Sequence, residues 1–416
     1  MSYLVTADAG NSGIKTIVEG EQFLLFPNIN ANIGKSVDYR TSSNLAVSSQ
    51  KSLGRNCLDV KVTPHFDKDN SDATNFLFGT MAEKYPGDKA NRENTDKSND
   101  PLLLCNILTS VAASVLSYAI NKEKNLKVKP ELTFHINLST GLPYSEWADE
   151  AKEIAFKKAL QGNHRIEFNN PYFTDTIGVK AIELVIDETM VWSEGDSALE
   201  AVRRSIKEDI EKIDPSDLLG QAFVLIDIGA FTTELIGAVF SEISEEDEEL
   251  AVDLETQQNY CTAIPKGIGN VFVDAIPLIE KNPAIKDNIT RRDIEIAYTG
   301  PTSKKPGKYG FIPGKGIMVN EYVYPLAEEF GAEIGRKFYG FYNQSGIKSN
   351  IRKIYICGGG SRFEKLANRL KEVLVKDGYS SEAIVTVSTP DPIYANAYGY
   401  FLYMVDELTE RAKSEE

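Results

Sequence analysis

One short pattern of acidic and glycine residues occurs twice in the chain, 219 positions apart, as Asp8-Ala9-Gly10 and Asp227-Ile228-Gly229. Each copy follows an apolar run and precedes a second apolar run, which predicts a strand, a tight turn and another strand. Glycine lets the turn approach a ligand closely, and successive turn N–H groups can point at an anion. The aspartate at the strand end suits hydrated Mg²⁺ or a water, because magnesium keeps several waters and takes few protein ligands.

Side chains suited to phosphate oxygens follow both aspartates. They are Asn11, Ser12, Gly13 and Lys15 in the first copy, and Thr232 and Thr233 in the second. Short hydroxyl and amide groups donate hydrogen bonds, and a lysine supplies a point charge for the β- and γ-phosphates. An Asp-Gly hairpin is common in any fold, and Lys15 could be an ordinary surface lysine. The repetition nevertheless favours two similar half-molecules that close on one nucleotide.

A third glycine turn lies near the C-terminal end. The apolar run Ile354–Cys357 leads into Gly358-Gly359-Gly360-Ser361 and then into a predicted helix from Arg362 to Lys376. A junction of strand, glycine and helix suits the close approach of a nucleotide, although a plain connecting loop has the same appearance. Gly314-Lys315 is not a P-loop, since Gly316 stands where that motif needs Ser or Thr.

The composition is that of a globular protein with two to four domains. The chain has 416 residues, of which 42% are hydrophobic and 25% charged, and its formal net charge is −16. This acidity argues against direct binding to DNA or RNA, whose phosphates demand a basic surface. The four cysteines and three histidines lack the spacing of zinc or haem sites, which predicts reduced thiols in a cytoplasm. The first strand begins near Met1, so no signal peptide is expected.

The pattern of apolar runs and breaks predicts the following organisation. Domain I spans 1–213 with an inserted subdomain at about 28–100, domain II spans 214–389, and a C-terminal helix at 390–416 returns to domain I. Strands are expected at Leu45–Val47, Cys57–Val62, Phe76–Phe78 and Glu131–Leu138, a turn at Ser139–Pro143, and a helix at Tyr144–Gln161. Tyr85–Asp100 and Glu242–Glu249 are predicted to be exposed, and Leu102–Ile120 to be a buried core helix because it carries Asn106 and several hydroxyl residues.

In five regions, taken in order, the sequence resembles the actin superfamily, which also contains sugar kinases and heat-shock chaperone ATPases. The matching regions are Asp8-x-Gly10-Asn11-Ser12-x-x-Lys15, Trp192-Ser193-Glu194-Gly195, Asp227-x-Gly229-x-x-Thr232-Thr233, Gly358-Gly359-Gly360-Ser361 and Tyr394-Ala395-Asn396-Ala397-Tyr398-Gly399. They correspond to two phosphate loops, an adenosine motif and two connecting segments. Within the superfamily, Thr140-Gly141-Leu142-Pro143 and the placement of Glu194 are most similar to ParM-type bacterial actins, which segregate plasmids.

This resemblance implies a fold and an activity. The fold would be α/β and actin-like, with two similar domains built on a duplicated ribonuclease-H-like core around a nucleotide cleft, and with small inserted subdomains. The protein would bind ATP or GTP, with Mg²⁺ held through water by Asp8 and Asp227. Asp227 would also help to position the attacking water and Glu194 would orient it. The alternative for Glu194 is a glutamate that favours a helix N-terminus.

The expected function is nucleotide-driven assembly of a head-to-tail filament in the cytoplasm, with disassembly after hydrolysis. A DNA-binding adaptor protein would link the filament to plasmid DNA, and no membrane partner is expected. The alternatives are a metabolite kinase of the same fold, a cytoskeletal or shape-related bacterial actin, a chaperone-like nucleotide switch, and a structural homologue that does not hydrolyse nucleotide. No sugar-kinase signature is visible, and the chain after the last connecting helix is short for a peptide-binding domain.

Overall fold

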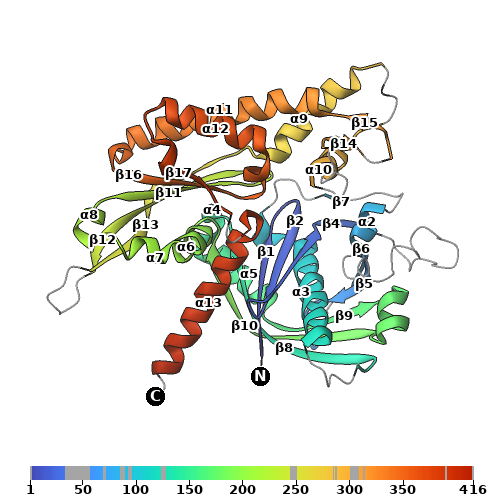
Figure 1. Ribbon diagram of the computed structural model, residues 1–416. Helices are drawn as coiled ribbons and strands as arrows, with labels where there is room; N and C mark the ends of the chain where they lie inside the picture. The colour runs from blue at the N-terminus through green and yellow to red at the C-terminus, as the bar shows by residue number, and fades with distance from the viewer. Residues whose placement is uncertain are drawn as a thin grey trace. The chain divides into compact units, whose positions relative to one another are not determined.

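A computed structural model describes residues 2–32, 57–68, 72–84, 90–91, 96–122, 128–243, 251–283, 285, 288–299, 309–312, 314–388 and 391–414. The chain divides into two compact units (Figure 1). Unit 1 comprises Met1–Ala201 and Asn396–Glu416, and unit 2 comprises Val202–Ala395. The predicted domain bounds at 213/214 and 389/390 remain predictions, and the junctions between the compact units lie at 201/202 and 395/396.

The sheet of unit 1 is built around a hairpin and two parallel strands. β1 pairs antiparallel with β2 and parallel with β8, and β8 pairs parallel with β10. The full strand order is β3-β2-β1-β8-β10-β9-β5-β6-β4-β7. The bounds are β1 Tyr3–Ala9, β2 Gly13–Val18, β3 Gln22–Pro27, β4 Ile29–Asn32, β5 Cys57–Thr63, β6 Thr74–Gly79, β7 Ala90–Asn91, β8 Glu131–Leu142, β9 Gly162–Phe168 and β10 Ala181–Ser193. The strands of the segment 28–100 therefore extend this sheet and do not form a sheet of their own.

The sheet of unit 2 repeats the central strand order of unit 1. Its order is β13-β12-β11-β16-β17, with β11 antiparallel to β12 and parallel to β16. The bounds are β11 Ala222–Ile228, β12 Thr233–Ile243, β13 Ala251–Ile264, β16 Ile351–Cys357 and β17 Ile384–Thr386, with a small hairpin of β14 Phe311–Ile312 and β15 Ile317–Met318. Three antiparallel strands followed by two parallel strands, in both units, confirm the predicted duplicated core.

Helices cover the sheet of unit 1. They are α2 Thr80–Lys84, α3 Pro101–Lys122, α4 Tyr144–Trp147, α5 Glu150–Leu160 and α13 Ala395–Ser414, with α6 Asp196–Ser205 at the junction with unit 2. Among the described residues, α3 is a helix whose length and apolar composition would allow it to cross a membrane. However, 83% of its most apolar 18-residue stretch is buried inside the protein. Its hydroxyl groups donate to carbonyls one turn earlier, as Ser110 does to Asn106 at 2.8 Å. The helix is a core element, as predicted.

The helices of unit 2 pack on its sheet in the same way. They are α7 Lys207–Ile210, α8 Pro215–Leu218, α9 Ile268–Glu280, α10 Arg291–Thr299, α11 Asn320–Gln344 and α12 Glu364–Lys376. α11 and α12 lie side by side (Figure 1). A Cβ at Gly331 would lie 2.5 Å from the Leu366 carbonyl, and one at Gly335 would lie 2.6 Å from Val373. The two glycines, one helical turn apart, let these helices approach closely.

The structure corrects two local predictions. Ser139–Leu142 is not a turn but the end of β8, because these residues pair with β10 and the Thr140 hydroxyl donates to the Ala7 carbonyl at 2.7 Å. The helix predicted at Tyr144–Gln161 is two helices, α4 and α5, since Asp149 caps a new helix by accepting from Ala151. The predicted strand Leu45–Val47 and most of Glu242–Glu249 lie outside the described residues.

Candidate functional site

The predicted site residues fall into both units. Unit 1 holds Asp8, Gly10, Asn11, Ser12, Gly13, Lys15 and Glu194, and unit 2 holds Asp227, Gly229, Thr232, Thr233, Gly358, Gly359, Gly360 and Ser361.

The first predicted phosphate turn is a β-hairpin with an ion pair across its strands. Asp8 lies opposite Lys15 in the pairing of β1 with β2, and their charged groups are 2.8 Å apart. A Cβ at Gly10 would lie 2.8 Å from the Lys15 nitrogen, so glycine leaves the space that the lysine occupies. The loop residues Asn11 and Ser12 are partly exposed. The hairpin therefore holds an ammonium group beside a glycine turn, an arrangement that suits phosphate.

Three buried asparagines support this loop. The Asn28 side chain donates to the Gly10 carbonyl at 2.9 Å, and its backbone N–H donates to the Ser12 carbonyl at 3.2 Å. Asn106, from α3, donates to the side-chain oxygens of Asn28 and Asn30 at 2.8 and 2.9 Å. Buried amides with satisfied hydrogen bonds hold one backbone arrangement. No local pattern in the sequence points to these asparagines, because their partners are far apart in the chain.

Glu194 follows the last residue of β10 and is tied to two neighbouring segments. Its N–H donates to the Leu142 carbonyl at 2.8 Å. Gly195, with φ of 78°, donates its N–H to the Asn396 side chain at 3.0 Å. The Glu194 carboxylate forms an ion pair with Lys97, and the two side chains are 15% and 8% exposed. Glu194 is therefore held at the end of a strand by its backbone and by its ion pair with Lys97.

Three charged groups of unit 1 influence the Glu194 carboxyl. Burial raises the pKa of the Glu194 carboxyl, Lys97 opposes that rise, Asp8 adds to it and Lys15 opposes it. Lys97, Asp8 and Lys15 therefore lie within electrostatic range of Glu194, and these four residues are a cluster of two acids and two bases in unit 1. That Asp8, Lys15 and Glu194 share a reaction site stays a prediction.

Lys97 is a member of this cluster that no pattern in the sequence indicated. It lies in the segment Tyr85–Asp100, which was predicted to be an exposed loop. That prediction was wrong for Lys97 and Ser98, which are 7% and 8% exposed. A lysine among Lys, Asn and Asp residues carries no local signal of burial, since only a partner distant in sequence decides it.

The second predicted phosphate turn is also a hairpin. Asp227 lies opposite Glu234 in the pairing of β11 with β12. The Gly229 N–H donates to the Thr232 carbonyl at 2.9 Å and closes the loop. The side chain of Thr232 is exposed and its hydroxyl can donate to a ligand. The two hairpins thus share the Asp-x-Gly turn, but the second has Glu234 where the first has Lys15.

The start of α9 packs against this second turn. The Ile268 N–H donates to the Gly229 carbonyl at 3.0 Å, and a Cβ at Gly267 would lie 2.4 Å from that carbonyl oxygen. The hydroxyl of Thr233 is buried and donates to the Lys266 carbonyl at 2.9 Å. Thr233 therefore ties the turn to α9 with its donor. The glycines at 267 and 269 were the signal in the sequence that could have revealed this contact.

The glycine motif after β16 lies against Asp227. Gly358 has φ of 79°, and a Cβ there would lie 2.1 Å from the Asp227 carboxylate. Cys357 is the strand neighbour of Asp227, and its thiol pKa is raised by burial and further by the Asp227 charge. The Ser361 hydroxyl donates to the Gly358 carbonyl at 2.8 Å, and Gly359 is exposed. Gly358 therefore leaves room for the aspartate, and this position accepts no other residue without strain.

Each unit offers one aspartate that suits a hydrated metal ion. In the part of the chain that the structure describes, no group of three or more His, Cys, Asp or Glu residues could hold a metal ion directly. Asp8 and Asp227 are single carboxylates at strand ends, and this donor set fits Mg²⁺, which keeps most of its waters and needs one or two carboxylates beside substrate phosphates.

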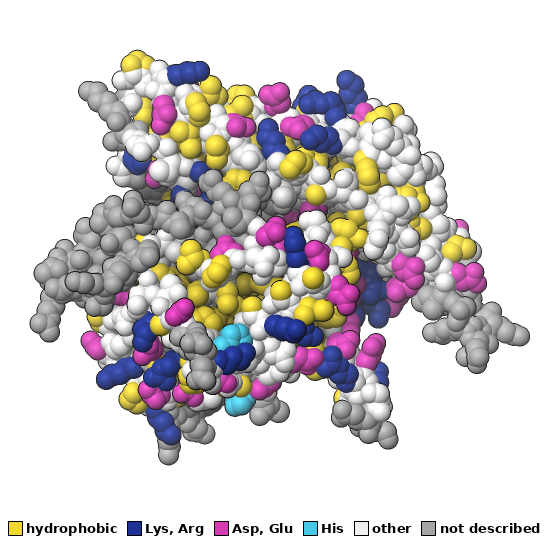
Figure 2. All heavy atoms as spheres, turned by 180° about the vertical axis from the view of Figure 1, so that it is seen from behind, with side chains coloured by type: hydrophobic (Ala, Val, Ile, Leu, Met, Phe, Trp, Pro, Cys, Tyr) yellow, Lys and Arg dark blue, Asp and Glu magenta, His cyan; other side chains and the backbone are white. Residues whose placement is uncertain are grey.

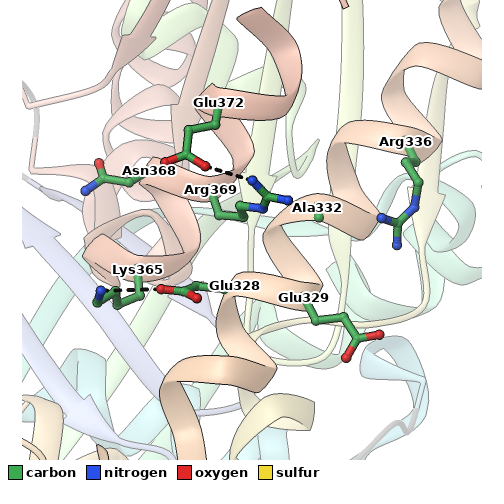
Figure 3. A pocket seen from close by; sticks show the side chains of 8 residues that line it. All are labelled: Glu328, Glu329, Ala332, Arg336, Lys365, Asn368, Arg369 and Glu372. Atoms are coloured by element: carbon green, nitrogen blue, oxygen red, sulfur yellow. Dashed lines mark hydrogen bonds and ion pairs between the residues drawn. The ribbon is translucent and has the colours of Figure 1, made fainter. Parts of the chain in front are cut away.

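A separate groove of about 560 Å³ lies between α11 and α12 of unit 2. Figure 3 shows one charged pair that joins the two helices, Glu328 with Lys365, and one within α12, Arg369 with Glu372. Glu328 pairs with Lys365 at 3.3 Å, and Arg369 pairs with Glu372 at 2.8 Å. Acidic and basic side chains both line the groove and their charges offset one another, so the groove does not select a charged ligand.

Comparison with solved structures identifies the fold as actin-like. The actin-like protein Alp7A aligns with a TM-score of 0.67 and 16% identity, covering 100% of this chain and 99% of that chain. A 15-stranded ParM filament from Clostridium botulinum aligns with a TM-score of 0.63 and 18% identity, covering 97% of this chain and 98% of that chain. Bacillus thuringiensis ParM with ADP aligns with a TM-score of 0.60 and 16% identity, covering 98% of this chain and 99% of that chain. Neither a protein-family model nor a curated protein matches the sequence.

Proposed function

We propose that this actin-like protein is an ATPase that polymerises on binding ATP–Mg²⁺ and disassembles after hydrolysis. The observation that carries this proposal is the repeated hairpin, since each unit has the same strand order and an Asp-x-Gly turn at the same place in it. The likeness to solved structures supports it, because one of them is named as a filament and another as a complex with ADP.

In this proposal the residues of each unit have defined tasks. Lys15 and the turn N–H groups of the first hairpin bind phosphate oxygens, and the exposed Thr232 hydroxyl donates from the second turn. The Glu194 carboxylate accepts a hydrogen bond from the attacking water and orients it, while Asp227 helps to position that water. Magnesium, held through water by Asp8 and Asp227, would neutralise negative charge on the phosphates.

The proposed assembly is a filament in the cytoplasm. A head-to-tail contact joins two different surfaces of the same protein, so it does not close on itself and continues into a polymer. Nucleotide binding favours the polymer if the nucleotide-bound subunit makes a stronger contact with its neighbour than the free subunit does. Hydrolysis then weakens this contact between subunits.

Assembly is therefore expected only with nucleotide and magnesium. The protein at tens of micromolar, a range suited to modest interfaces, should sediment with ATP–Mg²⁺ and stay in the supernatant with EDTA. A parallel sample with GTP–Mg²⁺ compares the two nucleotides, and light scattering should fall as phosphate is released. A protein that stays monomeric and phosphorylates a small metabolite would instead be the kinase alternative.

We further propose that the filament is linked to plasmid DNA by a basic adaptor protein and not by direct contact. The net charge of −16 opposes DNA phosphates. On the face shown in Figure 2, Lys and Arg side chains lie among Asp and Glu side chains. In a mobility-shift titration at about 0.15 M salt, the physiological ionic strength, the protein alone should not shift DNA with ATP or ADP. A sub-micromolar shift without any adaptor would contradict this model.

A further inference from the structure

The carboxylate of Glu146 holds the backbone of the segment that carries Lys97. Glu146 lies in α4, just after β8, and is 7% exposed. Its two carboxylate oxygens accept hydrogen bonds from the backbone N–H groups of Lys97 at 3.1 Å and Ser98 at 3.0 Å. Hydrogen bonds from N–H groups to an ionised carboxylate are among the stronger ones in proteins. Glu146 therefore fixes the start of the short 3-10 helix Lys97–Asn99.

The same segment places its ammonium group on Glu194. Both carboxylate oxygens of Glu146 accept hydrogen bonds from backbone N–H groups, so the negative charge of Glu146 is stabilised without the Lys97 side chain. The ammonium group of Lys97 pairs with Glu194 instead. The Glu194 N–H in turn donates a hydrogen bond to the Leu142 carbonyl, and the Glu146 N–H donates one to the Pro143 carbonyl at 2.8 Å. The contacts thus form a closed ring that starts and ends at the C-terminal end of β8.

We infer that Glu146 is a positioning residue for the proposed nucleotide hydrolysis, and that it acts on Glu194 through Lys97. The inference rests on the proposed function, in which Glu194 orients the attacking water. Glu146 does not contact the reacting atoms. It restricts Lys97 to one place, and Lys97 restricts the Glu194 carboxylate to one direction. Loss of such a restraint lowers the rate of a positioned reaction without weakening the binding of substrate.

A double-mutant cycle on Glu146 and Lys97 tests this chain of contacts. In the full-length protein, Glu146→Ala should lower the turnover of ATP about 10-fold, the scale of a small misplacement of a reacting group, with the dissociation constant of the nucleotide changed less than about twofold. Lys97→Met should have a similar effect. In the Lys97→Met background, Glu146→Ala should add less than about twofold, because the contact through which it acts is already lost.

Two further measurements separate positioning from a general loss of stability. Acylation of Lys97 by an amine-reactive reagent, followed by mass spectrometry, should rise in Glu146→Ala and stay unchanged in Glu150→Ala, a control at an exposed position of the adjacent helix. Glu146→Gln keeps the size of the side chain and one acceptor oxygen, so it should recover part of the turnover lost in Glu146→Ala. It replaces Glu146→Ala in the experiment if the alanine variant does not fold.

The outcomes distinguish the inference from the proposed function. Independent, multiplicative effects of the two substitutions, equal losses of turnover and affinity, or unchanged acylation of Lys97 would each overturn the role of Glu146. An unmodified protein without any nucleotide hydrolysis would overturn the proposed function, and with it this role. In that case the acylation result would still show whether Glu146 holds Lys97.

Discussion

Replacing Asp227 with alanine should slow phosphate release from bound ATP by roughly 100-fold or more, the scale found when a positioning or electrostatic group is removed. Asp227 lies at the end of β11 with Gly358 packed against its carboxylate, so its position is set by two strands. Release of phosphate should be measured in single turnover, with nucleotide affinity measured separately. If nucleotide still binds, polymer should still form and should persist longer than that of the unmodified protein.

The matched control for this variant is Asp217→Ala, which removes an exposed aspartate of the same unit. It should hydrolyse ATP at the unmodified rate. Unmodified turnover in Asp227→Ala would show that Asp227 is only a hairpin residue, and loss of its nucleotide binding would place it in ground-state binding instead of the reaction.

Replacing Glu194 with alanine should also slow phosphate release about 100-fold, as expected for a group that acts only on the attacking water, with little change in nucleotide affinity. The alanine variant leaves the ammonium of Lys97, 8% exposed, without its ion-pair partner. Glu194→Ala should therefore be compared with the double variant Glu194→Ala/Lys97→Met, which removes both charges. Equal slow turnover in the two variants would assign the loss to the carboxylate and not to the unpaired lysine.

The unmodified protein should also show the ionisation of Glu194 in its pH profile. Burial raises the pKa of this carboxyl, although Lys97 opposes the rise. Since the ionised form accepts the hydrogen bond from water, turnover should fall as pH decreases through this raised pKa, beginning above the range of an ordinary glutamate. The fall should be absent from the residual activity of Glu194→Ala. A combined loss of affinity and rate in that variant would instead indicate a folding role at the start of α6.

Features whose physical causes are local could be predicted from the amino-acid sequence. Asp8-x-Gly10 and Asp227-x-Gly229 between apolar runs predicted the two hairpins, because turn chemistry and strand alternation depend on neighbouring residues. The resemblance then implied a duplicated core, and the matching strand orders confirm it. The core helix after residue 100 was also predictable, since its hydroxyl groups bond within the helix.

Contacts between side chains that are distant in sequence depend on the tertiary fold. Lys97 and Glu194 are 97 residues apart, and Asn28 and Asn106 are 78 residues apart. Neither pair leaves a local pattern, because a polar side chain appears exposed until a distant partner buries it. The same holds for Gly358, whose lack of a Cβ is needed by Asp227 on a neighbouring strand. Strand pairing likewise overrode the turn predicted at Ser139–Pro143, because β10 supplies hydrogen-bond partners that the local sequence does not contain.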